Sequence, residues 1–110
     1  MKIENSDALL IVDVQSTFCP GGTLPVAGGD RVIPVINALL PLFAGRVYAS
    51  QDWHPANHCS FVAQGGVWQP HAVQNTEDAA LHPGLDTGAI ARIVRKGTQP
   101  DRDAYSAFDG

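Results

Sequence analysis

The sequence has little basic charge, few cysteines and no long apolar run, and each shortage excludes a class of protein. Lys and Arg number 7 against 11 Asp and Glu, for a net charge of -4, so there is no basic stripe of the kind that binds nucleic acid. The N-terminal apolar run covers only about seven residues between acidic groups, too short for a signal peptide or a spanning helix. We therefore expect a cytoplasmic protein with no nucleic acid or membrane partner.

Cysteine is represented only by Cys19 and Cys59. They do not form a C-x-x-C pair and no secretory signal precedes them, so we expect two free thiols. Neither opens a predicted helix, the setting that activates a thiol. Ser60 and Ser106 lack the G-x-S-x-G context of a nucleophilic serine. The residues alone therefore indicate no attacking group.

Three short segments are predicted to be strands, and the first is a continuous apolar run that ends in an acid, the pattern of a strand buried on both faces of a parallel sheet. They are ALLIVDV (8–14), RVYAS (46–50) and IARIVRK (90–96). The chain has 110 residues, 45% apolar and 16% charged, which is enough for one globular domain with a modest core. The predicted fold class is α/β.

A helix is predicted between the first two strands, where apolar positions recur at helical spacing from Asp30 to Phe43. Asp30 is the expected cap, and Pro41 is expected to end or kink the helix. The order strand, helix, strand predicts a right-handed βαβ unit. Residues 51–77 have no clear period, which in a compact domain usually indicates function, and a short helix is expected within 77–90.

Polar side chains follow all three predicted strands, as Asp13, QDWH (51–54) and Lys96. Ligands of open α/β sheets bind outside the carboxyl ends of the strands, so these groups should converge there. Singly, Asp13 could cap a loop and Lys96 could be an ordinary surface lysine. Together they would form a carboxylate and ammonium pair that tunes a nearby nucleophile.

The D-x-H pattern of Asp52 and His54 would point both side chains the same way from an extended strand end. His58 or His71 could complete a set of nitrogen and oxygen ligands, which suits Zn, Fe or Mn in a catalytic site with open positions. The alternative is that Asp52 only caps a turn.

Three aromatic residues, Phe18, Trp68 and Tyr105, lie in predicted loops rather than on periodic core faces. Such residues could wall a pocket for a flat ring. They could equally pack beneath long loops, and the spacing does not separate the two possibilities.

Four segments closely resemble, in family order, the motifs of the nicotinamidases, which belong to the isochorismatase-like cysteine hydrolases. They are IVDVQSTFCPGGTLPV, SQDWHPANHCSF, WQPHAVQNTEDAALHPGL and RKGTQPDRDAYSAFDG. The D-W-H-P and K-G-x(7)-Y-S-x-F elements distinguish nicotinamidases from metal-free relatives. The resemblance runs across essentially the whole chain. It implies a three-layer, Rossmann-like α/β fold with strand order 3-2-1-4-5-6, of which only strands 1 to 3 are present.

The resemblance also implies roles for individual residues. Asp13 matches the acid that takes the nucleophile's proton, and Lys96 matches the lysine that stabilises the thiolate. The implied ligands of one divalent metal, with Zn favoured over Fe or Mn, are Asp52, His54 and His71, joined in some members by His58; the implied walls of the nicotinamide pocket are Phe18, Trp68 and Tyr105. In the family, the metal holds the pyridine nitrogen while a cysteine attacks the carboxamide and expels ammonia. Water then hydrolyses the thioester.

Two departures from the family pattern qualify this expectation. The family's catalytic cysteine lies further along the chain, so residues 1–110 are expected to be a C-terminally truncated isochorismatase-like hydrolase domain, inactive alone. WQPHAV replaces the commoner W-P-x-H-C-V and puts Ala72 in place of a thiol, while His71 keeps its position. The whole protein is expected to be a nicotinamidase of NAD salvage, with homo-oligomer formation left open. The alternatives are another small-amide hydrolase of the superfamily, or a non-catalytic metal-binding or interaction module.

Overall fold

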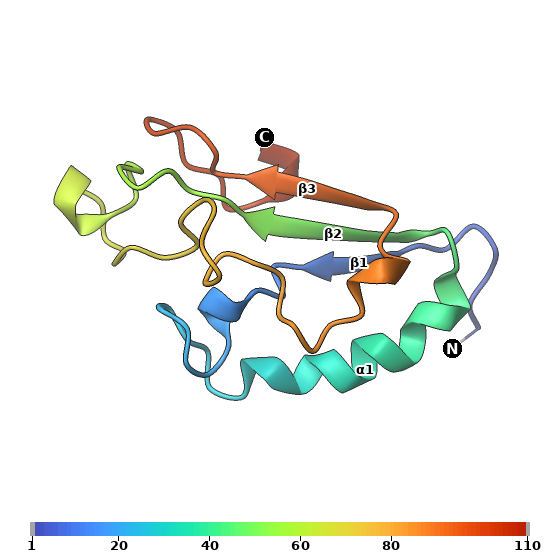
Figure 1. The fold of residues 1–110 in the computed structure, drawn as a ribbon. Helices are drawn as coiled ribbons and strands as arrows, with labels where there is room; N and C mark the ends of the chain where they lie inside the picture. Colours follow the sequence, from blue (N-terminus) through green and yellow to red (C-terminus); the bar gives the residue numbers. More distant parts are fainter. Residues whose placement is uncertain (1, 110) are drawn as a thin grey trace.

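The computed structural model describes residues 2–109 and has a parallel sheet at its centre (Figure 1). The strands are β1 (Leu9–Val12), β2 (Val47–Asp52) and β3 (Arg92–Lys96), in the order β1-β2-β3. Both neighbouring pairs are parallel, so the three carboxyl ends lie at one edge of the sheet. The predicted α/β class is confirmed, and the order of the strands matches the first half of the expected one.

The strand boundaries differ from the expected ones where pairing overrides local sequence. β2 was expected over 46–50 but runs to Asp52, because Asp52 pairs with Lys96 of β3. β1 is shorter than the apolar segment 8–14, and it stops at Val12 because Asp13 has a left-handed φ of 53°. Asp52 therefore belongs to a strand, and the sheet fixes the direction of its side chain.

The helix α1 (Val32–Leu39) lies between two 3-10 turns, Gly29–Arg31 and Leu40–Phe43. Pro41 falls in the second turn, so α1 ends just before it, as expected. The expected cap at Asp30 is wrong: Arg31 is the N-cap residue, and no side chain caps the helix, because Asp30 is already part of the preceding turn. None of the helices in residues 2–109 combines the length and apolar character needed to cross a membrane.

The connection from β2 to β3 is almost entirely irregular. The short helix expected within 77–90 does not form, and the only helical piece there is the 3-10 turn Thr87–Ala89. The backbone of residues 80–82 bonds instead to the segment after β1. Ser16 N–H donates to Ala80 O over 3.0 Å, and His82 N–H donates to Val14 O over 3.0 Å. These long-range bonds hold the loop against the carboxyl end of β1.

The core lies between one face of the sheet and α1 with its flanking turns. Figure 1 shows α1 and the segment around residue 85 running along the same side of the sheet. The buried cluster consists of Ile11, Val14, Ile33, Leu40, Phe43, Val47, Ala49 and Leu85. This packing buries one face of the sheet only, so the expectation that β1 is buried on both faces is wrong for residues 2–109.

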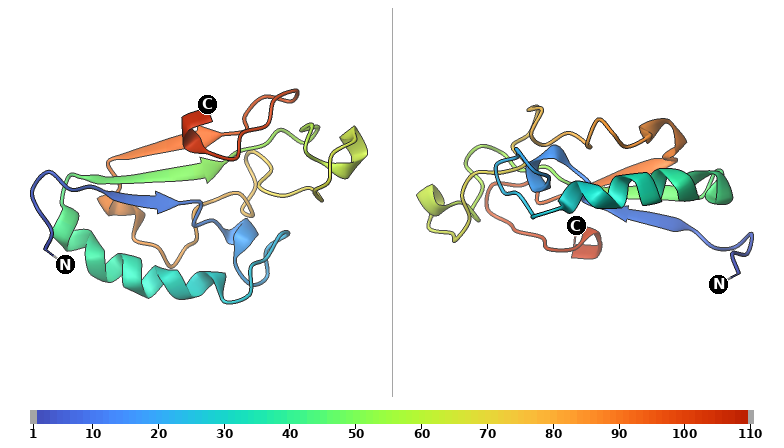
Figure 2. Two further views of the ribbon diagram at one scale, coloured as in Figure 1. Left: turned by 180° about the vertical axis from the view of Figure 1, so that it is seen from behind. Right: turned by 90° about the horizontal axis from the view of Figure 1, so that it is seen from below.

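The opposite face of the sheet carries apolar side chains that the described residues leave largely uncovered. Leu10 and Val12 of β1 are 62% and 68% exposed. Only the C-terminal segment approaches this face, and Figure 2 shows its last turn beside β3. Residues 105–108 border a cavity of about 280 Å³ there, together with Tyr48 and Val94.

Candidate metal centre and active site

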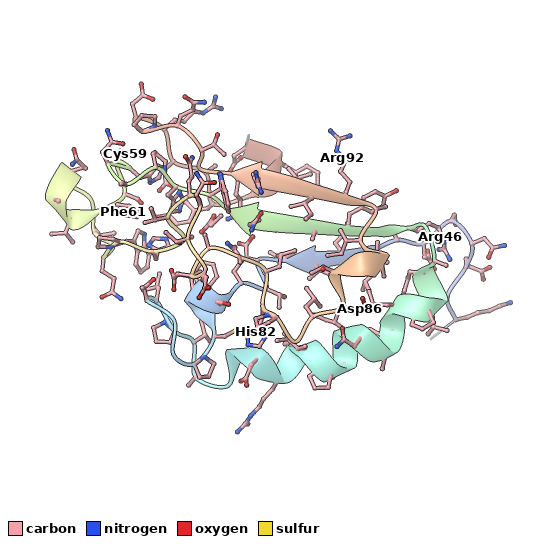
Figure 3. All side chains as sticks on the ribbon, in the orientation of Figure 1. Arg46, Cys59, Phe61, His82, Asp86 and Arg92 are labelled. Carbon is pink, nitrogen blue, oxygen red and sulfur yellow. The ribbon has the colours of Figure 1, made fainter. Side chains whose placement is uncertain are left out.

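Polar side chains from all three strands meet at the carboxyl edge of the sheet, as the sequence predicted. Figure 3 shows the loops around Cys59 and Phe61 at this end, opposite the end occupied by Arg46. A cavity of about 240 Å³ opens among these groups. Its lining residues are Asp13, Phe18, Leu24, Asp52, His54, Ser60, Trp68, His71, Lys96, Asp103, Ala104 and Tyr105.

Asp52, His54 and His71 form a compact buried triad. Asp52 Oδ2 lies 3.5 Å from His54 Nε2 and 4.0 Å from His71 Nε2. One ligand-type atom from each residue lies within 4.8 Å of the others. The expectation that Asp52 and His54 face a common point is therefore confirmed, and His71, one of the two histidines expected to complete the set, joins them from the following loop.

Hydrogen bonds fix both imidazole rings of the triad in the same tautomer. His54 Nδ1 lies 2.8 Å from Gly97 O, and His71 Nδ1 lies 2.8 Å from Gln69 O. A carbonyl oxygen only accepts, so Nδ1 carries a proton in each ring and Nε2 is the nitrogen that faces Asp52. Metal-binding histidines are oriented in this way by backbone carbonyls.

The donor set of the triad fits a divalent metal ion. Two imidazole nitrogens and one carboxylate oxygen are ligands that zinc accepts, and three protein ligands leave positions for water or substrate. Iron and manganese accept the same mixture of nitrogen and oxygen. All three residues are buried, so their ligand atoms face one another instead of bulk water.

Gly97 makes room for the His54 ring. A Cβ atom at Gly97 would lie 2.4 Å from His54 Cε1, and Gly97 has a φ of +61°, which L side chains rarely adopt. The K-G element of the sequence therefore combines two functions: Lys96 reaches the site, and Gly97 provides both space and a hydrogen-bond acceptor for His54.

Lys96 lies between two carboxylates. Its Nζ is 3.0 Å from Asp13 Oδ2 and also bonds Asp52 Oδ1, while Ser50 Oγ donates to Asp13 Oδ1 over 2.7 Å. Burial alone would lower the pKa of Lys96, but the bonds and charges of Asp52 and Asp13 raise this pKa above its ordinary value. Lys96, only 3% exposed, is therefore a buried ammonium ion.

Asp52 and His54 shift each other's pKa in opposite directions. Burial would raise the pKa of Asp52, but bonds and charges from His54 and Lys96 bring it below its ordinary value. Burial would lower the pKa of His54, yet Asp52 and the Gly97 carbonyl raise it above its ordinary value. Without metal, the pair thus favours carboxylate and imidazolium, so a proton and a metal ion compete for His54 Nε2.

His58 lies beside the triad with both ring nitrogens already paired. Its ring stacks on His54 with centroids 4.1 Å apart. His58 Nε2 donates to Arg102 O over 3.0 Å, so Nδ1 is the acceptor for Ser60 Oγ at 2.7 Å. In this arrangement His58 supports the wall of the triad, and the predicted additional ligand role would require the loss of these bonds.

The three aromatic residues singled out in the sequence all line the cavity. Trp68 Nε1 donates to the Tyr105 hydroxyl over 3.4 Å, and the Trp68 and His71 ring centroids are 6.4 Å apart. Phe18 approaches His71 from another element, with centroids 6.0 Å apart. The walls beside the triad are therefore aromatic, as a pocket for a flat ring requires.

Sequence reasoning missed Phe61 and Asp103, which both lie in this region. Phe61 is 1% exposed, and its ring centroid lies 5.7, 5.7 and 5.4 Å from those of His54, His58 and His71. Asp103 lines the cavity and helps to raise the pKa of His54. Neither lies in a periodic segment, so no sequence pattern indicated its position.

The two cysteines are free, as expected. Cys19 is buried in the loop after β1, and burial raises the pKa of its thiol above the ordinary value. Among residues 2–109, the cavity at the triad is lined by neither Cys19 nor Cys59. The described residues thus bring ligands, a carboxylate and an ammonium ion together without a thiol.

A model of the Isochorismatase domain family matches residues 7–110. The chain belongs to the isochorismatase family. Family membership agrees with the parallel sheet and with the place of the polar cluster at its carboxyl edge. It also confirms the resemblance carried by the sequence motifs.

Within the family, the chain is similar to proteins named nicotinamidase. The chain is 44% identical to the nicotinamidase of Acinetobacter baylyi, an alignment covering 98% of this chain and 58% of that protein. It is 47% identical to the nicotinamidase of Escherichia coli, covering 92% of this chain and 56% of that protein. The chain thus spans little more than half the length of these relatives.

Solved structures give the same result for the fold. PnC1 from L. infantum, in complex with nicotinate, superposes with a TM-score of 0.91 at 45% identity, covering 97% of this chain and 56% of that chain. The pyrazinamidase of Pyrococcus horikoshii in complex with zinc superposes with a TM-score of 0.83 at 45% identity, covering 94% and 58%.

Proposed function

We propose that this chain carries the metal-binding and substrate-binding part of a nicotinamidase, an enzyme that converts nicotinamide to nicotinate and ammonia. One observation carries the proposal: the Asp52, His54 and His71 triad shares a cavity with the Asp13 and Lys96 pair. Relatives named nicotinamidase at 44% and 47% identity support it, as do the nicotinate and zinc complexes of similar structures. Because the chain spans just over half of these relatives, the activity proposed is that of the whole protein.

The triad and the aromatic walls would bind the substrate. A divalent ion held by Asp52, His54 and His71, zinc in the first place, would accept the lone pair of a ring nitrogen and fix the ring. Phe18 and Trp68 would contact the flat pyridine ring, and the bond between Trp68 and Tyr105 keeps the indole in position. Such contacts orient the carboxamide and exclude water from the ring.

Asp13 and Lys96 would serve the chemical steps. The Asp13 carboxylate would take the proton of a thiol nucleophile and return it to the departing nitrogen as the C–S bond forms and the C–N bond breaks. The Lys96 ammonium would stabilise the thiolate through its charge. Water, deprotonated by Asp13, would then cleave the C–S bond, releasing nicotinate and restoring the thiol.

The nucleophile required by this scheme is a cysteine outside the two found here, since neither of these lines the cavity. The same observation favours a second candidate function, a non-catalytic metal-binding module that uses the triad alone. Hydrolysis of another small amide is the remaining alternative within the family. A cytoplasmic location and homo-oligomer formation stay predictions.

Ammonia release by the whole protein tests the function. Nicotinamide should be hydrolysed, and a chelator should abolish the reaction until zinc is restored. Benzamide is the matched control, because it keeps the ring and the carboxamide but lacks the ring nitrogen, and it should react at least tenfold more slowly. Undiminished hydrolysis in the presence of the chelator would remove the metal from the mechanism. Equal rates with benzamide would contradict recognition of the ring nitrogen.

The isolated 110-residue chain provides the complementary test. It should bind zinc and release no ammonia from nicotinamide. Ammonia release at the rate of the whole protein would show that the nucleophile lies within these residues and would overturn the scheme above.

A further inference from the structure

Gln15 is a fully buried polar residue that the proposed reaction does not use. It follows β1 by three positions, and its relative exposure is 0%. A buried amide without hydrogen bonds costs at least about 1 kcal/mol, so partners are required to keep it inside. Its partners therefore indicate what the side chain does.

The Gln15 amide bonds both main-chain groups of Asp52. Asp52 N–H donates to Gln15 Oε1 over 2.9 Å, and Gln15 Nε2 donates to Asp52 O over 2.8 Å. The second proton of Nε2 goes to Ala79 O, also at 2.8 Å. The side chain thus pairs with one residue of β2 in the way that a neighbouring strand would.

This pairing begins where the main chain of β1 leaves the sheet. The ladder between β1 and β2 ends at Val12 and Ser50, and Asp13 N–H makes one last bond to Ser50 O over 3.1 Å. Asp13 then turns away with its left-handed φ of 53°. Without Gln15, the next main-chain groups on this side of β2, those of Asp52, would be buried and unpaired.

We infer that Gln15 is a positioning residue that extends the sheet by its side chain and holds Asp52 so that its carboxylate faces His54 and His71. The inference rests on the proposed metal site. On the other side of β2, Asp52 is fixed by its pairing with Lys96 of β3. Gln15 therefore provides the hydrogen bonds of the Asp52 main chain on the side of β2 where β1 has ended. Asp52 is the residue that supplies the oxygen ligand.

A merely structural role is the competing explanation, since Gln15 also ties down the loop at Ala79. Gln51 provides a matched control because its Nε2 donates to the same Ala79 O over 2.9 Å, while its side chain makes no bond to Asp52. Gln15→Met removes the bonds to Asp52 and Ala79 at similar side-chain length. Gln51→Met removes the bond to Ala79, together with the bond that Arg95 Nε donates to Gln51 Oε1 over 3.1 Å, and leaves the bonds of Asp52 in place.

The test compares Co²⁺ affinity and the visible Co²⁺ spectrum of the whole protein with those of the two variants. Gln15→Met should weaken Co²⁺ binding by about 10- to 100-fold and alter the spectrum. Gln51→Met should leave the affinity within about twofold, whatever its effect on the melting temperature. Equal losses in the two variants, or an unchanged affinity in Gln15→Met, would overturn the inference. A parent protein that binds no Co²⁺ would refute the metal site itself and the inference with it.

Hydrogen exchange of the Asp52 amide gives a readout that does not depend on metal. Its acceptor is Gln15 Oε1, so exchange should accelerate at least tenfold in Gln15→Met and stay slow in Gln51→Met. Gln15→Glu serves if the methionine variant does not fold, because a buried glutamic acid is held neutral, keeps the acceptor for Asp52 N–H, and has one proton for Asp52 O and Ala79 O in place of two. It should preserve slow exchange yet still weaken Co²⁺ binding, and rapid exchange in this variant would contradict the proposed pairing.

Discussion

Two regions of the sheet differ in how well the described residues provide for their side chains. The buried polar groups at the carboxyl edge all have hydrogen-bond partners, whereas the apolar side chains on the face away from α1 are left exposed. At the polar edge, Lys96 is 3% exposed and bonded to two carboxylates. Within residues 2–109, no buried side-chain nitrogen or oxygen atom lacks a hydrogen-bond partner. On the apolar face, Leu10 and Val12 remain mostly exposed, although exposing large apolar groups is unfavourable.

The difference shows that the polar edge is held in place by the described residues themselves, whereas the apolar face is not covered by them. The groups proposed to bind metal are held by bonds among strands and loops that lie far apart in the sequence. Among residues 2–109, the apolar face has only the C-terminal segment 105–108 beside it. We expect substitutions at the polar edge to change metal binding and stability sharply, and substitutions on the apolar face to have little effect on the stability of this chain.

Lys96→Met should have the largest effect. It removes the ammonium ion between Asp13 and Asp52 and leaves two carboxylates facing each other, which for a buried ion pair typically costs about 4 kcal/mol. Denaturant unfolding at neutral pH measures the loss. Lys2→Met is the control, because Lys2 is exposed and lies 3.9 Å from an exposed Glu4 carboxylate, and it should change stability by less than about 0.5 kcal/mol. A similar result for both lysines would mean that the buried pair contributes no more than a surface one.

Ile11→Ala and Val12→Ala compare the two faces of β1 directly. Ile11 is 2% exposed and lies in the core cluster, so its truncation should destabilise the chain by about 3 kcal/mol. Val12 is the next residue but points to the apolar face, and its truncation should cost less than about 0.5 kcal/mol. Thermal unfolding of both variants checks the contrast. Equal losses would show that the apolar face is covered in solution.

Gly97→Ala should weaken zinc binding about 100-fold, equivalent to about 2.7 kcal/mol, because the new methyl group would displace His54. Competition with a chromophoric chelator measures the affinity. Gly45→Ala is a matched control: Gly45 also has a positive φ, +78°, but a Cβ atom added there would have no other atom within 4 Å. It should share the backbone strain and keep the zinc affinity. Loss of affinity in both variants would attribute the effect to strain and not to the contact with His54.

Asp78→Asn should have the smallest effect, about 1 kcal/mol at neutral pH. Asp78 accepts bonds from Thr23 and from the backbone of Ala72, the residue after His71. Burial would raise the pKa of Asp78, but these bonds bring it below its ordinary value. The stabilisation is therefore present above the unfolded pKa and is lost as the pH falls through the lower folded pKa.

Unfolding measured from neutral to acid pH checks this assignment. The difference between the parent and Asp78→Asn should be constant at neutral pH and shrink as the pH falls below about 4. Glu77→Gln, a change at the exposed neighbouring residue, should leave the profile unchanged. A difference that grows toward acid pH would have the wrong sign for the proposed role of Asp78.

The sequence was sufficient to predict the sheet and the place of the site. Apolar segments that end in Asp13 and Lys96 indicated parallel strands with a polar carboxyl edge, since the side-chain pattern of a buried strand is local. The spacing of Asp52 and His54 indicated a shared point for the same reason. The extension of β2 to Asp52 was not predictable, because it depends on pairing with a strand more than 40 residues away.

The remaining parts of the site depend on loops whose course no local pattern determines. The position of His71 follows from bonds between segments 15–24 and 71–80, such as those that Thr23 N–H donates to Asp78 and Ala72 N–H donates to Thr17. Nothing in the local sequence distinguishes Gln15 from other polar loop residues, because its role depends on bonds to Asp52, 37 residues away. Asp30 shows the opposite error: a good capping residue was overridden by the 3-10 turn that contains it.

The metal site is the central claim, and zinc titration by calorimetry tests it most directly. The metal-free parent should bind one zinc ion per chain, and His71→Ala should lower the affinity at least about 100-fold. His58→Gln should retain most of the affinity, because both ring nitrogens of His58 bond Ser60 and Arg102 instead of facing the triad. Zinc binding that survives His71→Ala, or that is lost equally in His58→Gln, would contradict the ligand set described here.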